Sequence, residues 1–179
     1  DLRMSRGLGD VYKRQNILTP DKCRVYWYVD ETSRKIITEE AEKYQILPFM
    51  DFKGYVPASE IPSILNSSSV LLLLTNRAAN SGPKGVMTTK FFESLAVEKP
   101  VLCVRSDESY LAEAINDANA GLAATNVNEV CDFLKSYYQE WKEKRYTSSS
   151  IKKSKLVRFS RKEQAKQFIQ IFEKVEING

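Results

Sequence analysis

Short runs of apolar, β-branched and aromatic residues recur along the chain, and each run has the length of a β-strand. The run at 70–74, Val-Leu-Leu-Leu-Leu, is apolar on both faces, which is typical of a central strand in a parallel sheet. The run at 50–56 is closed by Pro57, which cannot continue a ladder. The pattern predicts strands at 24–29, 50–56, 70–74, 100–104 and 121–125.

Helical spacing of apolar residues follows most of these runs. Thr32, Ser59 and Asn128 are expected to cap helices that end near residues 44, 65 and 141. Thr88 or Thr89 is expected to begin a helix that ends at 97. Further helices are expected at 109–118 and 160–175.

Each of these helices has an apolar face that should contact a core. The side chains expected on these faces are Ile36, Ile37, Ile61, Ile64, Leu65, Leu111, Ala114, Ile115, Ala165, Phe168, Ile169 and Phe172. Strands that alternate with helices in this way predict the α/β class. We expect a Rossmann-like parallel sheet with helices on both faces.

Two parts of the chain are distinguished by their patterns. Residues 1–15 have no sustained apolar period and resemble a translated sequencing-adaptor segment, so we leave them out of the fold. A flexible N-terminal arm is the alternative. Residues 16–179 have the length of one domain. On the adaptor interpretation, the natural protein extends upstream of Asn16 and residues 16–179 are a partial domain.

Composition narrows the choice of partners. With 42% hydrophobic and 28% charged residues, the chain has the composition of a folded globular protein. The net charge is only +4, and the Lys and Arg residues are scattered among acidic residues. This distribution gives no reason to expect binding to nucleic acid. The basic stretch at 142–161 is interpreted as a solvated helix end, with a surface near lipid phosphate or a second domain as the alternative.

No apolar run has the length of a membrane span, and no signal peptide is evident. We therefore expect a cytoplasmic protein, with at most a peripheral contact at the inner face of a membrane. Cys23, Cys103 and Cys131 are an odd number without metal-binding spacing, which favours a reducing compartment. Cys103 is expected to be a small buried side chain in a strand.

The chain contains no histidine, and this excludes several kinds of chemistry. A Ser-His-Asp triad, a histidine-ligated metal site and a histidine general base are all ruled out. Asp107 and Glu108 follow a predicted strand and could hold a metal, but a solvated loop is the simpler interpretation. We expect neither a metal nor a cofactor.

The segment at 85–104 is the most informative, because a Gly/Thr-rich loop, a helix and a buried strand follow one another in it. A polar loop that feeds a helix N-terminus at a sheet edge often holds a phosphate. Thr88 and Thr89 can cap the helix and also contact a phosphate. Glu93 lies further along the helix and could accept hydrogen bonds from a sugar hydroxyl.

Two basic residues are candidate phosphate partners. Lys90 lies in the first turn of the expected helix, and Arg77 follows the strand at 70–74, at the end of the sheet where ligands bind. For both residues, an exposed position without a ligand is an equally good interpretation.

Further segments have the order and spacing of a known family. They are 52–57 (Phe-Lys-Gly-Tyr-Val-Pro), 64–74, 112–122, which ends in Ala-Gly-Leu, and 157–161 (Val-Arg-Phe-Ser-Arg). Together with 85–104 they resemble the C-terminal, donor-binding half of the retaining GT-B glycosyltransferases of family 4. The resemblance covers residues from about 23 to 175.

The resemblance implies a nucleotide diphosphate sugar donor, a saccharide or lipid-linked acceptor, and a missing N-terminal domain that binds the acceptor. Glu93 matches the second glutamate of the E-x7-E motif of the family, which binds the ribose hydroxyls. The amides of Met87, Thr88, Thr89 and Lys90 would face the diphosphate. The residues that would lie beside the base are Gly54, Tyr55 and Val56. The fragment alone would be inactive, and bacterial envelope polysaccharide is the implied destination.

One departure from the family concerns the donor sugar. Gly85 occupies the position of the first glutamate of the motif, which contacts that sugar in the family. The contact would have to come from Ser81, Lys84 or the main chain. A glycine-rich variant of the motif exists within the family, and Lys-Phe-Phe-Glu at 90–93 resembles it.

A second departure concerns the sheet. The family's early diphosphate-binding Arg and Lys have no match here. If 24–29 is the second strand of a doubly wound sheet, the first strand, which lies beside the strand at 70–74, is absent. Two apolar strands would then have unpaired edges, so the fragment should be poorly soluble or oligomeric. A sharp, reversible melt of a monomer would contradict this.

Three other functions are alternatives to the transferase. A GT-B nucleotide-sugar epimerase depends on acidic groups and histidine, and the chain has no histidine. A receiver domain needs an acidic cluster and a phosphoacceptor aspartate at strand ends, which are lacking after Leu74. A non-catalytic nucleotide- or protein-binding α/β module remains, and an upstream acceptor domain would distinguish the transferase from it.

Overall fold

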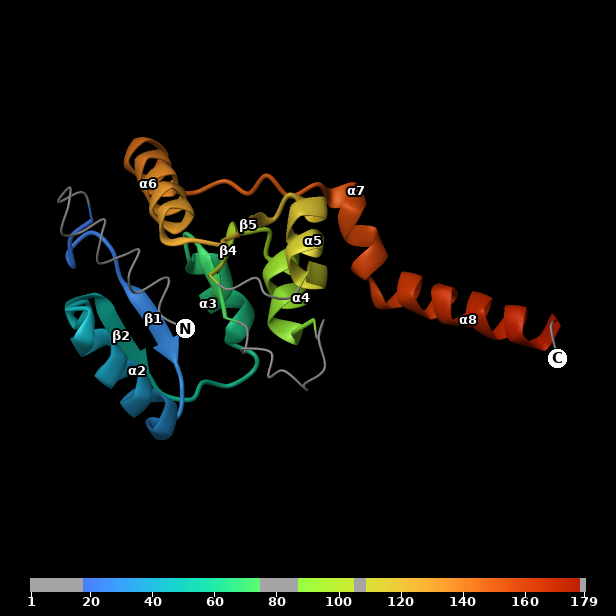
Figure 1. Ribbon diagram of the computed structural model, residues 1–179, viewed down its shortest axis with the longest axis horizontal. Helices are drawn as coiled ribbons and strands as arrows, with labels where there is room; N and C mark the ends of the chain where they lie inside the picture. The colour runs from blue at the N-terminus through green and yellow to red at the C-terminus, as the bar shows by residue number, and fades with distance from the viewer. Residues whose placement is uncertain (1–17, 75–86, 105–108, 178–179) are drawn as a thin grey trace.

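The protein has an α/β fold in which parallel strands form two small sheets flanked by helices (Figure 1). A computed structural model describes residues 18–74, 87–104 and 109–177. Each strand forms within its predicted run, because each apolar run is long enough for one strand. The strand predicted at 50–56 is shorter than expected, since β2 ends at Lys53 and not at Pro57. The fold class expected from the alternation of strands and helices is confirmed.

The first sheet contains two parallel strands, β1 (Val25–Tyr28) and β2 (Met50–Lys53), in register from Val25↔Met50 to Tyr28↔Lys53. Helix α2 (Glu31–Lys43) and a short 3-10 helix (Leu47–Phe49) connect them. Helix α3 (Ile61–Ser67) then leads to the second sheet.

The second sheet has three parallel strands in the order β3-β4-β5. The strands are β3 (Leu71–Leu73), β4 (Val101–Cys103) and β5 (Gly121–Ala123). The helices that follow them are α4 (Thr89–Ala96), α5 (Ser109–Ala118) and α6 (Val127–Lys144). The chain ends with α7 (Lys153–Leu156), a 3-10 turn (Val157–Phe159) and α8 (Arg161–Ile177).

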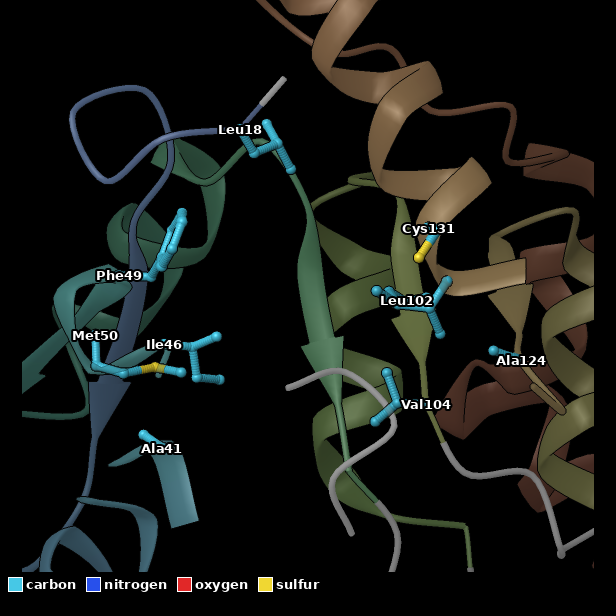
Figure 2. Packing of buried hydrophobic residues seen from close by; sticks show 10 residues of the cluster. Leu18, Ala41, Ile46, Phe49, Met50, Leu102, Val104, Ala124 and Cys131 are labelled. Atoms are coloured by element: carbon cyan, nitrogen blue, oxygen red, sulfur yellow. The ribbon is translucent and has the colours of Figure 1, made fainter. Parts of the chain in front are cut away.

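Side chains alternate across the second sheet and enter two cores. On β4, Leu102 packs in a cluster with Val130 of α6, whereas Val101 and Cys103 pack in a second cluster with α4 and α5. The first cluster also includes Phe49 of the 3-10 helix and Met50 of β2, so it joins the two sheets (Figure 2). Cys103 is fully buried, as its strand position predicts.

Within the described residues, no strand pairing joins the two sheets. The strands on the two sides of the break are β1 and β3 (Figure 2). This is the position at which the sequence predicts a missing central strand. Each of these strands is paired on one side only within the part of the chain that the structure describes.

Three predicted helix caps are wrong by one or two residues. Asp30, not Thr32, caps α2 by accepting the Ser33 N–H at 2.8 Å. Asn126, not Asn128, caps α6 by accepting the Glu129 N–H at 3.0 Å. Helix α3 has Glu60 at its N-cap and no side-chain cap bond, so Ser59 has no capping role.

Several apolar side chains expected in the core are exposed. Ile36 of α2 is exposed, and Ile61, Ile64 and Leu65 of α3 are only half-buried. Helix α8 extends away from the sheets (Figure 1), so its predicted apolar face has no core to enter. The exposed side chains on it are Ala165, Phe168, Ile169 and Phe172. By contrast, Leu111, Ala114 and Ile115 of α5 are buried as predicted.

The start of α6 carries a reciprocal cap whose strength should depend on pH. The Glu129 carboxylate accepts the Thr125 N–H at 2.7 Å, and this backbone hydrogen bond lowers the pKa of Glu129. Because the pKa is lowered in the folded state, the carboxylate stabilises the protein above its unfolded-state pKa. That contribution is lost as the pH falls through the folded-state pKa.

We therefore expect Glu129→Gln to flatten the acid limb of the stability curve, measured by urea unfolding between neutral pH and the acid transition. Glu113→Gln is a matched control, because Glu113 is exposed on α5 and its side chain makes no hydrogen bond within the described residues. If the two variants have the same acid limb, the cap does not contribute to stability.

Candidate functional site

The N-terminus of α4 lies at the carboxyl end of the second sheet. The chain leaves β3 at Leu73, enters α4 at Thr89 and returns to form β4 parallel to β3. A helix that connects two parallel strands runs back along the sheet, so its N-terminus is near the edge at which the strands end. Ligands bind at this edge in open α/β sheets.

Thr88 caps α4, as the sequence predicts. Its backbone is extended, with φ −75° and ψ 146°, and its Oγ1 accepts the Lys90 N–H at 3.0 Å. The Thr88 carbonyl accepts the Phe91 N–H at 3.1 Å. The amides of Met87, Thr88 and Thr89 make no hydrogen bond within the described residues. The Lys90 amide, which was expected to face a phosphate, is already used by the cap.

The opposite face of α4 is fixed in the core. Phe91 is fully buried, and its ring meets Phe159 edge-on at 5.7 Å and lies 5.8 Å from Phe92. Ser94 is buried and donates its hydroxyl to the Lys90 carbonyl at 2.7 Å. These contacts set the rotation of α4 about its axis and so decide which residues face solvent.

Glu93 lies on the exposed face of α4, one turn after Thr89. Because it is four residues after Thr89, Glu93 lies on the same face of α4 as Thr89, and its Cα–Cβ bond tilts toward the helix N-terminus. The carboxylate makes no hydrogen bond or ion pair within the described residues. Lys90 is also exposed and has no acidic partner there. Both charged groups are therefore accessible to a ligand.

The residues expected beside the base form a separate group. Gly54 directly follows β2, and Tyr55 is 101% exposed, so its ring is open to stacking and is not part of the core. Val56 is half-buried. No hydrogen bond or ring contact joins Gly54, Tyr55 or Val56 to α4 within the described residues.

Other predicted positions lie outside the described residues. These are Arg77, Gly85, Ser81, Lys84, Asp107 and Glu108. The structure thus brings together Met87, Thr88, Thr89, Lys90 and Glu93 on one helical turn and its neighbour.

Phe159 is a site-supporting residue that sequence reasoning did not identify. It lies in the turn before α8, far along the chain from α4, and its ring packs on Phe91 and Phe92. The adjacent Arg158 donates to Asp117 of α5 at 2.6 Å and holds this turn in place. No local pattern reveals such a contact; the only available signal was the resemblance at 157–161.

The cysteines are poorly suited to chemistry. Cys103 and Cys131 are buried. Burial raises the pKa of Cys23 to about 11, so its thiol stays protonated at neutral pH. Among residues 18–74, 87–104 and 109–177, no group of three or more acidic or thiol side chains is placed to hold a metal ion.

Comparison of the chain with protein-family models, curated proteins and solved structures finds no match. In the described part of the chain, no helix has the length and apolarity needed to cross a membrane.

Proposed function

We propose that the chain is the donor-binding part of a retaining GT-B glycosyltransferase and binds a nucleotide diphosphate sugar. The observation that supports this most directly is the start of α4. The amides of Met87, Thr88 and Thr89, and Glu93 one turn later, have no hydrogen-bond partner among the described residues and lie at the carboxyl edge of a parallel sheet. An anion and a hydroxyl-bearing group could be bound there together.

The free amides and the helix dipole would interact with the diphosphate. The N-terminus of a helix carries a partial positive charge, and each free N–H can donate to a phosphate oxygen. In transfer, the same groups would stabilise the leaving diphosphate as its charge develops. Lys90 is exposed beside them and could add a full positive charge.

Glu93 would bind the ribose. A carboxylate accepts hydrogen bonds but donates none, so two neighbouring hydroxyls are suitable partners for it. Its position one turn into α4 would separate the ribose from the diphosphate along the helix. Tyr55 would offer its exposed ring to the base at the end of β2.

The donor sugar and the acceptor would be bound by groups outside α4. With Gly85 in place of an acidic residue, the contact to the donor sugar would come from other groups, such as Ser81 or Lys84. The acceptor, a saccharide or lipid-linked saccharide, would be bound by a separate N-terminal domain. A cytoplasmic enzyme with a peripheral membrane contact would suit a lipid-linked acceptor.

Titration calorimetry with UDP and GDP tests the donor site. We expect one of the two nucleotides to bind, and Glu93→Ala to weaken its binding roughly 10- to 100-fold, the effect of losing a charge-assisted hydrogen bond. Glu113→Ala is the matched control, because it removes an exposed helical glutamate on α5.

Two outcomes would contradict this assignment. One is that neither nucleotide binds to the folded chain. The other is that Glu93→Ala and Glu113→Ala bind equally well. Either result would favour the alternative, a protein-binding α/β module. A nucleotide could bind through Glu93 while a protein that also carries the acceptor domain transfers no sugar. That outcome would favour a non-catalytic nucleotide-binding module or an epimerase.

A further inference from the structure

A cavity of about 440 Å³ lies between α6 and the start of β5. Ligand cavities in proteins usually enclose roughly 300 to 1,000 Å³, so this one has room for a small organic molecule. No described residue of α4 lines it, so it is separate from the candidate donor site. The lining residues that give it its chemistry are Gly121, Leu122, Glu129, Asp132, Phe133 and Tyr137.

The charged side chains of this cavity are acidic. Glu129 and Asp132 line it, and no Lys or Arg of the described residues does. The two acids are three residues apart on α6, so their side chains are neighbours on the helix surface. The Thr125 backbone hydrogen bond lowers the pKa of Glu129 and keeps its carboxylate ionised at neutral pH. The cavity is therefore negative in a chain whose net charge is +4.

Asp132 is held only weakly by the rest of the chain. Its ion-pair partner is Lys135, whose Nζ lies 3.9 Å from the carboxylate. The Asp132 side chain is 80% exposed, and ion pairs of this kind at a surface contribute little. The Asp132 carboxylate can therefore exchange this contact for a bound cation.

Two aromatic rings lie beside the carboxylates. The centroids of Phe133 and Tyr137 are 4.7 Å apart, and the rings are tilted by 54°. Both residues are half-buried, so part of each ring remains accessible. Aromatic faces attract cations, and elsewhere on α6 the chain supplies its own, since Lys142 lies 6.0 Å from the Tyr138 ring. No Lys or Arg within the described ranges lies over Phe133 or Tyr137.

The edge of β5 adds a backbone acceptor. In a parallel ladder, the peptide groups of successive residues turn alternately to the two sides of the strand. The Val101 N–H donates to the Ala120 carbonyl at 2.9 Å, so the carbonyl of Gly121 turns away from β4. On that side β5 has no neighbouring strand within the described residues. An N–H group of a molecule in the cavity could donate to this oxygen.

We propose that the cavity binds an alkylammonium ion. The ammonium group would lie against the rings of Phe133 and Tyr137 and donate to the Asp132 carboxylate and the Gly121 carbonyl. Glu129 would add a second negative charge one turn away. The alkyl part would contact Leu122, which is half-buried on the β5 side. This inference does not depend on nucleotide binding.

Other ligands fit this lining less well. A metal ion needs more protein ligands than two carboxylates, and the described residues contain no group of three acidic or thiol side chains placed to hold one. An anion would be repelled by Glu129 and Asp132. A neutral molecule would leave both carboxylates without a counter-charge.

Titration of the full chain with putrescine, followed by amide NMR, tests the proposal. We expect saturable shifts at Gly121, Phe133 and Tyr137, which weaken as salt is added. Butanediol is the matched control ligand, because it has the same chain and can form hydrogen bonds but carries no charge. A Gly-Lys-Gly peptide with blocked ends is a further arm. Tighter binding of the peptide than of putrescine would identify a protein lysine as the source of the ammonium group, and the reverse order would identify a free amine.

Two substitutions test the assigned groups. We expect Asp132→Asn and Tyr137→Leu each to weaken putrescine binding roughly 3- to 10-fold. The matched controls are Glu143→Gln and Tyr146→Leu, because both residues are exposed and neither lines the cavity. If Tyr137→Leu fails to fold, the exposed Asp132 still provides the test.

Three results would overturn the proposal. The first is that putrescine causes no saturable shift at the cavity. The second is that butanediol binds as well as putrescine, which would indicate a ligand recognised through hydroxyl groups. The third is that Asp132→Asn and Glu143→Gln bind putrescine equally well, which would indicate general attraction to the acidic side chains of the surface.

Discussion

Replacing Gly121 by alanine is expected to lower the free energy of unfolding by about 3–5 kcal/mol. Gly121 begins β5 opposite Val101 of β4 and has a φ of +151°, which residues with a side chain rarely adopt. An added β-carbon would lie 2.0 Å from the Val101 carbonyl oxygen and 2.7 Å from its nitrogen. Both contacts are with backbone, so β4 and β5 would have to move apart.

Gly54→Ala is the matched control, because an added β-carbon there meets nothing within 4 Å. It should change stability by less than about 0.5 kcal/mol. Urea unfolding followed by circular dichroism compares the two variants with the parent. If Gly121→Ala unfolds at the parent's urea midpoint, the close approach of β5 to β4 is not as the structure has it.

Replacing Phe91 by alanine should cost about 3–5 kcal/mol, the usual loss when a buried phenylalanine is truncated in a core. Phe91 is 0% exposed and its ring contacts Phe92 and Phe159. Because these contacts fix the rotation of α4, the variant should also weaken any ligand binding that depends on Glu93. Thermal or urea unfolding measures the first effect, and nucleotide titration of the folded variant measures the second.

Phe172→Ala provides the control for hydrophobic truncation, since Phe172 on α8 is 66% exposed. It should change stability by less than about 0.5 kcal/mol and leave ligand binding unaltered. Equal losses in Phe91→Ala and Phe172→Ala would contradict the view that α4 is anchored through the aromatic cluster.

Helix ends were harder to predict than helix positions, for a local reason. The sequence around α2 contains Asp30, Thr32 and Ser33 within a few residues, and each can act as a cap. The choice among them depends on where the preceding strand ends, since β1 stops at Tyr28 and leaves Asp30 extended at the start of the helix. The same shift explains the choice of Asn126 over Asn128 after β5.

The candidate site was partly predictable because half of it is local. Met87, Thr88 and Glu93 belong to one helix and its cap, so their spacing alone places them within two turns. The relation of Gly54 and Tyr55 to α4 depends on how the two sheets are arranged, and no sequence period encodes that. Phe159 was missed for the same reason, because its partners Phe91 and Phe92 are distant in sequence.

The sequence by itself determined the elements, because the periods of apolar residues differ between strands and helices and each element needs only its neighbours to form. It also placed Thr88 and Glu93 on one helix. Only the tertiary structure decided that Phe159 anchors α4 and that the apolar face of α8 is exposed. These features depend on contacts between residues far apart in the chain. A local pattern shows that a side chain is apolar, but it does not show which residues that side chain will contact.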